Sequence, residues 1–208
     1  MDTTEISHVI LVIIVLAFSA SLAKLSYPAF FLTALFFAII FIVNIAVKKI
    51  AAYYVRAGVE TRILYFQRYG LKEKQYLKYP VPLGVILPLL VSIASLGQFF
   101  WLAATQTEVR ALKARVSKKH DFYSYSEMTE WHVGVIPAAG IAACLILAFV
   151  AYLIGQSELG KLAIFFACFN MIPLGNVDGS KIFFGSLIMW FVLAAISIIA
   201  LGYALLLI

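Results

Sequence analysis

Long stretches without a single charged residue constrain this chain most. Asp, Glu, Lys and Arg are absent from residues 6–23, 25–47, 79–107, 131–157, 162–177 and 182–208. A membrane-spanning helix needs about 20 consecutive apolar residues. The mean hydropathy is +1.01, which a water-soluble domain could carry only with very large exposed apolar patches. We therefore predict an all-α polytopic membrane protein with five to six transmembrane or re-entrant helices.

The distribution of the basic residues indicates whether the uncharged stretch 79–107 crosses the membrane. Most lysines and arginines lie between Lys48 and Lys119, in one block before this stretch and one after it. A complete crossing would split them between the two faces, against the tendency of basic loops to stay cytoplasmic. We predict a re-entrant segment at about 82–104, with a short helix near 83–96, a reversal at Gly97–Gln98 and an extended return.

The remaining stretches give the predicted topology of one membrane domain covering 1–208. Basic loops are cytoplasmic, the N-terminus is inside and the C-terminus is outside. The first stretch has no basic residues before it and no small-residue cleavage site, so we expect it to be retained as a span. The predicted spans are 8–24, 28–52, 133–155, 160–177 and 183–206, with a cytoplasmic loop at 105–132.

Two polar segments of the loops carry their own patterns. Thr61–Tyr79 is rich in tyrosine and lysine with a break at Gly70, which predicts a small interfacial hairpin or an ordinary tyrosine-rich loop. In Thr107–Lys119, apolar residues recur at helical spacing among charged ones. That pattern predicts an interfacial amphipathic helix, which would anchor to lipid or dock a partner.

One polar motif interrupts the apolar C-terminal third: Asn170-Met-Ile-Pro173-Leu-Gly-Asn-Val-Asp178-Gly179. Read as N-x-x-P-x-x-x-x-D-G, it resembles the motif with which site-2 proteases, the intramembrane zinc metalloproteases of peptidase family M50, supply a carboxylate to their metal. The segments at 59–62, 82–84, 97–104 and 134–140 resemble the archaeal members in the same order. The segment at 134–140 lacks the family's Gly-Pro-x-x-Asn, and Thr105 stands where a proline is expected.

The rest of the family's zinc site is missing. A His-Glu-x-x-His helix places two ligands four residues apart on one face, beside a general base. Residues 29–59 contain no His, Glu, Asp or Cys. Alignment on Lys48-Lys49-Ile50-Ala51 puts Val43, Asn44 and Val47 at the two histidines and the glutamate. The resemblance therefore implies a degenerate member without a catalytic residue, a metal or another cofactor, in which Asp178 is a vestigial ligand position.

Two environments are open for Asp178. It could pair with Lys181 at the membrane interface, or line a polar interior with Asn170 and Asn176 that faces Asn44. The histidines are His8, His120 and His132. Of these, His132 is the one that a rearranged metal site with Asp178 would recruit. Cys144 and Cys168 lie in apolar stretches and are interpreted as packing residues.

The leading functional hypothesis is a catalytically inactive, site-2-protease-like accessory or scaffolding subunit. It would pack against transmembrane segments of a larger complex, with the return segment at 99–104 as a receptor edge. The alternatives are an active zinc protease with a rearranged site and a small transporter component. Expected partners are membrane lipids and other transmembrane subunits, with no nucleic acid and no small-molecule substrate. The archaeal resemblance implies the cell membrane of a prokaryote.

Overall fold

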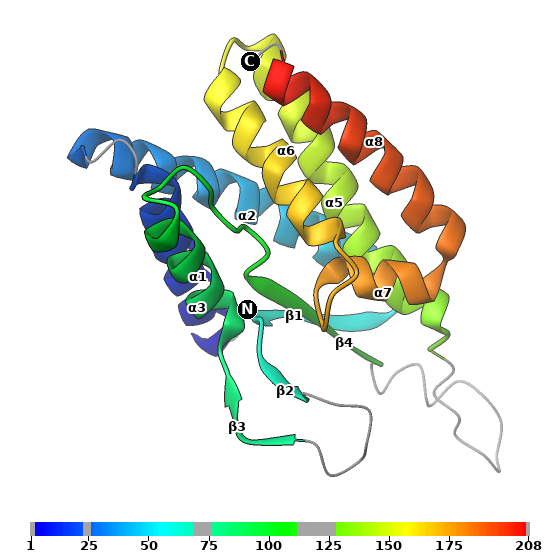
Figure 1. Cartoon of the computed structure of the whole chain (residues 1–208). Coiled ribbons are helices and arrows are strands. Elements are labelled where there is room, and N and C mark those ends of the chain that lie inside the picture. Colours follow the sequence, from blue (N-terminus) through cyan, green and yellow to red (C-terminus); the bar gives the residue numbers. More distant parts are fainter. Residues whose placement is uncertain (1–2, 23–25, 69–75, 112–127, 207–208) are drawn as a thin grey trace, which may run out of the picture.

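The computed structural model describes residues 3–22, 26–68, 76–111 and 128–206, and most of them are helical (Figure 1). The helices are α1 (Thr3–Ser21), α2 (Tyr27–Val55), α3 (Leu83–Ala94), α5 (Glu130–Leu153), α6 (Ser157–Met171), α7 (Asp178–Gly185) and α8 (Leu187–Leu206). The strands are β1 (Ala57–Ile63), β2 (Phe66–Arg68), β3 (Tyr76–Val81) and β4 (Thr105–Ala111).

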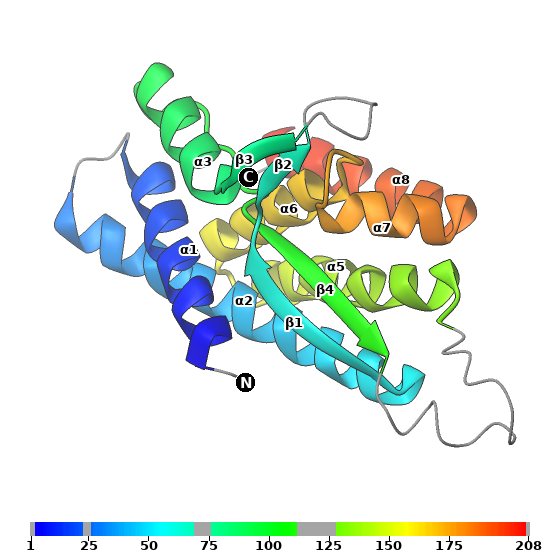
Figure 2. The same cartoon turned by 90° about the horizontal axis from the view of Figure 1, so that it is seen from below.

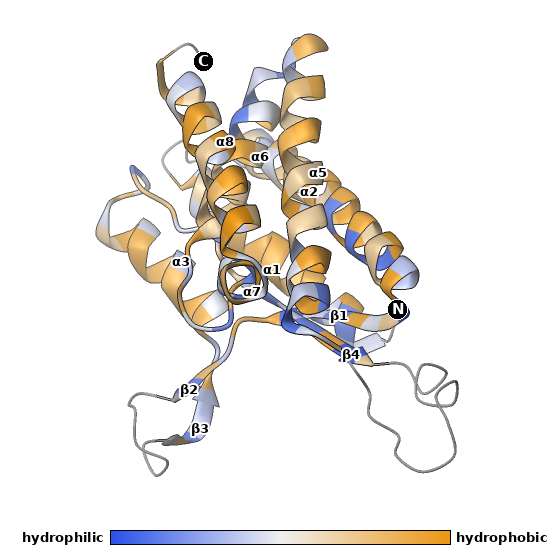
Figure 3. Cartoon of the chain, turned by 90° about the vertical axis from the view of Figure 1, so that its right-hand side faces the viewer, coloured by the Kyte–Doolittle hydropathy of each residue, from blue (hydrophilic) through white to orange (hydrophobic). Residues whose placement is uncertain are grey.

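Among the described residues, four helices are long and apolar enough to cross a membrane, namely α1, α2, α5 and α8. Hydrophobic residues make up most of these helices, whereas the ribbon of β1 and β4 is largely hydrophilic (Figure 3). The long apolar stretches thus form helices of membrane-spanning length, as the sequence predicts. The number of crossings and their orientation remain predictions.

Two of the predicted spans differ from the helices that form. The span predicted at 160–177 is the shorter α6, which ends at Met171 because Pro173 has no amide donor and Gly175 adopts a left-handed φ of +59°. The span predicted at 183–206 is divided at Ser186, whose φ of −164° and ψ of 113° are extended. The short helix α7 precedes this break and α8 follows it.

Helix α5 is the centre of the bundle and packs against α2, α6, α7 and α8. Its contact with α7 is close, because a Cβ on Gly134 would lie 3.1 Å from the Cα of Gly185. On the other side of α2, α1 packs against α2 and α3. The fully buried aromatic side chains Phe37, Phe41 and Phe166 lie in this core, where α2 meets α6.

The segment between β3 and β4 leaves the bundle end and returns to it. Helix α3 is followed by a reversal in which Leu96 and Gly97 have positive φ, and an extended stretch leads back to β4. Both ends meet at Leu64, whose N–H donates to the Ala104 carbonyl and whose carbonyl accepts from the Gly84 N–H, each at 2.9 Å. A Cβ on Gly84 would fall 2.0 Å from the Ala104 oxygen, so only glycine fits there.

Strands β1 and β4 form an antiparallel ribbon that lies across one end of the helices (Figure 2). The amphipathic helix predicted at 107–119 is therefore wrong for Thr107–Ala111, which pair with Ala57–Thr61; the rest of it lies outside the described residues. Strands β2 and β3 form a second antiparallel pair that overlaps the predicted 61–79 hairpin region and extends beyond it to Val81. The predicted all-α class is thus right about the helices but misses the ribbon.

Candidate functional site: a buried lysine–aspartate pair

Asp178 is the first residue of α7 and is 1% exposed. The amino end of a helix carries a partial positive charge, which favours a carboxylate there. Its neighbour Gly179 allows α7 to reach the end of α6, because a Cβ on Gly179 would lie 2.3 Å from the Met171 carbonyl oxygen. The Asp-Gly dipeptide of the motif therefore combines a buried acid with a backbone contact that excludes larger residues.

The partner of Asp178 is Lys48, on α2. The Lys48 Nζ lies 2.5 Å from the Asp178 Oδ2, and both side chains are almost completely buried. The second oxygen, Oδ1, has no hydrogen-bond partner among the described residues. Burying two charges costs several kcal/mol for each ion, which close pairing must offset. The structure thus joins the motif to α2 through an ammonium–carboxylate pair.

A glycine on α5, Gly140, leaves room for the Lys48 side chain. A Cβ on Gly140 would lie 2.6 Å from the Lys48 Cε and 3.0 Å from the Asn44 Nδ2. The Asn44 amide also donates a weak hydrogen bond to the Cys144 Sγ at 3.4 Å. Asn44, Lys48, Gly140 and Cys144 therefore belong to one buried polar cluster between α2 and α5.

Lys181 does not form the predicted ion pair with Asp178. Its Nζ donates instead to the backbone carbonyl of Thr107 on β4. Burial lowers the pKa of Lys181, although the negative charge of Asp178 acts in the opposite direction. The sequence suggested Lys181 because it is close in the chain, whereas Lys48 is 130 residues away.

The predicted polar interior is only partly correct. Asn170 is buried, and its Nδ2 donates to the Phe166 carbonyl at 2.8 Å, which is a local helix contact. Asn176 is exposed, as is Pro173, so Asn176 does not line the interior as predicted. Both lie in the exposed turn between α6 and α7.

On α2, one of the three aligned positions, Asn44, faces the site together with Lys48, which is not among those three. Val43 and Val47 are half-buried, whereas Asn44 and Lys48 are 2% and 1% exposed and lie in the cluster. Residues four apart share a helix face. Asn44 and Lys48 therefore hold the spacing that two metal ligands of a His-Glu-x-x-His helix would occupy.

The described part of the chain contains no group of three His, Cys, Asp or Glu residues able to hold a metal. His132 lies near the start of α5, where its Nδ1 is 2.5 Å from the Thr129 Oγ1 and its ring packs against Trp131. His8 is on α1, and His120 lies outside the described residues. The structure does not bring His132 into the Asp178 cluster.

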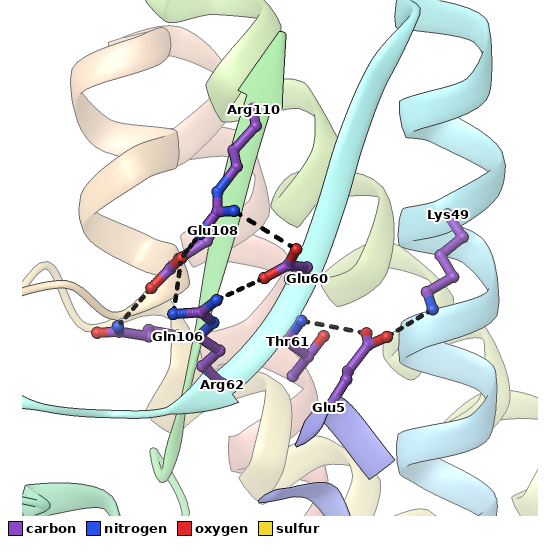
Figure 4. Close-up of polar contacts among 8 residues, drawn as sticks. All are labelled: Glu5, Lys49, Glu60, Thr61, Arg62, Gln106, Glu108 and Arg110. Carbon is purple, nitrogen blue, oxygen red and sulfur yellow. Dashed lines mark hydrogen bonds and ion pairs between the residues drawn. The ribbon is translucent and has the colours of Figure 1, made fainter. Parts of the chain in front are cut away.

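A second polar cluster lies on the ribbon and is drawn in Figure 4. Glu60 and Glu108 are directly opposite each other in the ladder, which would be unfavourable alone. Arg62 and Arg110 each pair with both glutamates, at N–O distances of 2.8–3.7 Å. These side chains are partly exposed, so we interpret the cluster as charge compensation on the ribbon surface.

Glu5 fixes the other edge of the ribbon to the helices. Its carboxylate is 4% exposed, accepts from the Thr61 N–H at 3.2 Å and pairs with the Lys49 Nζ at 2.9 Å (Figure 4). This contact ties α1, α2 and β1 together. Sequence reasoning did not single out Glu5, although an acid at the start of an apolar helix is a visible signal.

The buried pair has an evident chemical consequence. An ammonium group already neutralises the carboxylate that the motif provides, and the α2 side chains beside it are an amide and a lysine. Neither is among the usual imidazole, thiolate and carboxylate ligands of Zn²⁺. No protein-family model matches the chain, and the searches of curated proteins and of solved structures give no match either.

Proposed function

We propose that this chain is a catalytically inactive, site-2-protease-like membrane protein that acts as an accessory or scaffolding subunit. It would lie in the cell membrane of a prokaryote with its basic loops in the cytoplasm, and pack against transmembrane segments of other proteins. The observation that carries this proposal is the 2.5 Å contact between the Lys48 Nζ and the Asp178 carboxylate. A lysine ammonium occupies the charge position that a metal ion would need.

The structure also changes which surface we expect a partner to contact. The second half of the return segment, residues 102–104, is not an open edge: the Ala103 carbonyl accepts from the Trp101 indole N–H at 3.0 Å, and the Ala104 carbonyl accepts from the Leu64 N–H. Leu102, Ala103 and Ala104 are all 0% exposed. The membrane-facing helices are therefore the better surface for a partner than this segment.

The first test is metal content. The full chain, purified without chelator from cells grown with zinc, should contain far less than one zinc per chain by mass spectrometry. Lys48 excludes the cation by charge, so added zinc should not raise the thermal unfolding temperature. A stoichiometric, tightly held zinc would contradict the proposal.

The second test is proteolysis, which addresses the rival hypothesis of a rearranged active site using Asp178 and His132. The wild-type chain and the Asp178→Asn and His132→Ala variants are incubated in vesicles with membrane-helix substrates of site-2 proteases. We expect the three proteins to give the same background. Cleavage by the wild type that both variants lose would establish the active protease instead.

A further inference from the structure

A groove of about 590 Å³ runs between α6 and α8 and is closed at one side by residues 98–100. Helices α6 and α8 pack against each other there. The lining residues of α8 include Trp190, Ala194, Ser197, Leu201 and Leu205. Their spacing of three or four residues is that of a helix face presented to another helix.

The α6 wall has the same periodicity, with Phe165, Cys168, Phe169 and Ile172 facing the groove. From Trp190 to Leu205 the α8 wall is about 22 Å long at 1.5 Å per residue. That is most of the thickness of a bilayer's hydrocarbon core, which is about 30 Å. The α6 wall, from Phe165 to Ile172, spans only about 10 Å at the same rise per residue, so a third transmembrane helix would lie mainly along α8.

A polar atom in the groove identifies the occupant more closely. Ser197 is 1% exposed and lines the groove, yet its hydroxyl has no hydrogen-bond partner among the described residues. Leaving such a group unpaired in an apolar environment is costly. It lies midway along α8, at a depth where a lipid tail has no polar atom to offer. A helix with an amide or hydroxyl side chain does.

Small residues line the groove near Ser197. Ala194 and Cys168 line the groove beside Ser197, and small residues let two helix backbones approach closely in a membrane. Helix α8 is also the least buried candidate span, with 17% of its most apolar window buried against 33–44% for the others. It therefore has the most surface left for a neighbour.

We propose that this groove binds one transmembrane helix of a partner protein, and that an Asn, Gln, Ser or Thr side chain of that helix hydrogen-bonds to the Ser197 hydroxyl. The proposal rests on the proposed scaffolding function and names where and how the partner is held. It involves neither Lys48 nor Asp178. Its test therefore uses binding alone, and its failure would leave the metal and proteolysis tests unaffected.

The test uses the full chain in lipid vesicles, labelled with a donor fluorophore. The probe is a synthetic transmembrane peptide of about 23 leucine and alanine residues with one central Asn and an acceptor fluorophore. A matched peptide has Leu in place of Asn. The variants are Ser197→Ala, Ala194→Phe, which fills the groove, and Val192→Phe as the control on the exposed face of α8.

Energy transfer should show the Asn peptide binding about three- to tenfold more tightly than the Leu peptide, as one interhelical hydrogen bond provides. Ser197→Ala should abolish this difference in affinity. Ala194→Phe should weaken the binding of both peptides, and Val192→Phe should leave the binding of both unchanged. Equal binding of the two peptides to the wild type would overturn the proposal. The proposal would also be overturned if Ala194→Phe removed only bound lipid, or only a second copy of this chain, and left the binding of both peptides unchanged.

Discussion

A buried lysine about two turns before the end of an apolar helix is the most informative residue of this protein. Lys48 is 1% exposed, and Gly140 provides the space that its methylene chain fills. Ionisable groups in such surroundings are usually paired, because an unpaired charge is strongly unfavourable in the membrane. The pair with Asp178 therefore gives both buried charges a partner within the chain.

Removing one member of this pair should cost far more than removing both. Lys48→Met leaves the Asp178 carboxylate buried and alone, so we expect the free energy of unfolding to fall by about 3–5 kcal/mol. The double variant Lys48→Met, Asp178→Leu should recover most of that loss, since apolar packing can replace a buried ion pair. Reversible unfolding in detergent measures both.

The exposed Lys78→Met change is the matched control for this experiment and should stay within about 0.5 kcal/mol of the wild type. Lys78 lies on β3 and contacts only the Tyr79 ring among the interactions of the described residues. If Lys48→Met were as mild as Lys78→Met, the buried pair would not be the contact that holds α7 to α2.

The sequence could indicate the importance of Asp178 but not its partner. Acid, proline and glycine in one apolar region form a visible signal, whereas the contact with Lys48 depends on how two distant helices pack. The sequence favoured Lys181, three residues away. Lys181 instead contacts β4, a strand that the sequence did not predict.

The strand β4 shows how periodicity can mislead at a segment boundary. Val109 belongs to an apolar helical pattern with Leu112 and Val116, yet Thr105, Thr107 and Val109 alternate with Gln106, Glu108 and Arg110. That alternation is the period of a strand. Pairing with β1 decides between the two, because Thr105–Ala111 form a continuous antiparallel ladder with Ala57–Ile63.

Metal binding can test which face of α2 meets α7. Asn44→His with Lys48→His places two imidazoles four residues apart beside Asp178, which gives the three protein ligands typical of an open zinc site. We expect this double variant to bind one zinc per chain, measured by mass spectrometry after dialysis. Asp178→Asn in the same background should abolish the binding.

The control moves the same pair of histidines by one residue. Val43→His with Val47→His follows the sequence alignment, but those positions are half-buried and rotated away from the cluster. This variant should bind no zinc above the wild type. Equal binding by the two double variants would mean that α2 does not present Asn44 and Lys48 to Asp178.

For the whole chain, the apolar stretches predicted most of the helices because membrane length and composition leave few alternatives. They did not predict where the C-terminal stretch is divided, since Ser186 carries no strong breaking signal. The ends of the 79–107 excursion meet at Leu64. This contact links three segments that are distant in the sequence, so no local sequence pattern could predict it.

The arrangement of the bundle ends predicts the membrane topology. Strands β1 and β4 lie at one end, and the turn between α5 and α6 lies at the other, near the C-terminus (Figure 1). Tyr79 and Arg110 flank the excursion. Tyr79 is 73% exposed, and the side chain of Arg110 is 59% exposed. If the excursion is re-entrant, cysteines at these two positions should be on the same side of the membrane.

In a Cys168→Ala background, Tyr79→Cys and Arg110→Cys should react with a membrane-impermeant maleimide from the cytoplasmic side only. Gln156→Cys, in the exposed α5–α6 turn, should react from the opposite side only. Leu96→Cys, at the tip of the excursion and 81% exposed on the bundle surface, should be protected from both sides by lipid. Labelling of Tyr79→Cys and Arg110→Cys from opposite sides would make 79–107 a complete crossing and divide the basic residues between two compartments, which the distribution of charge opposes.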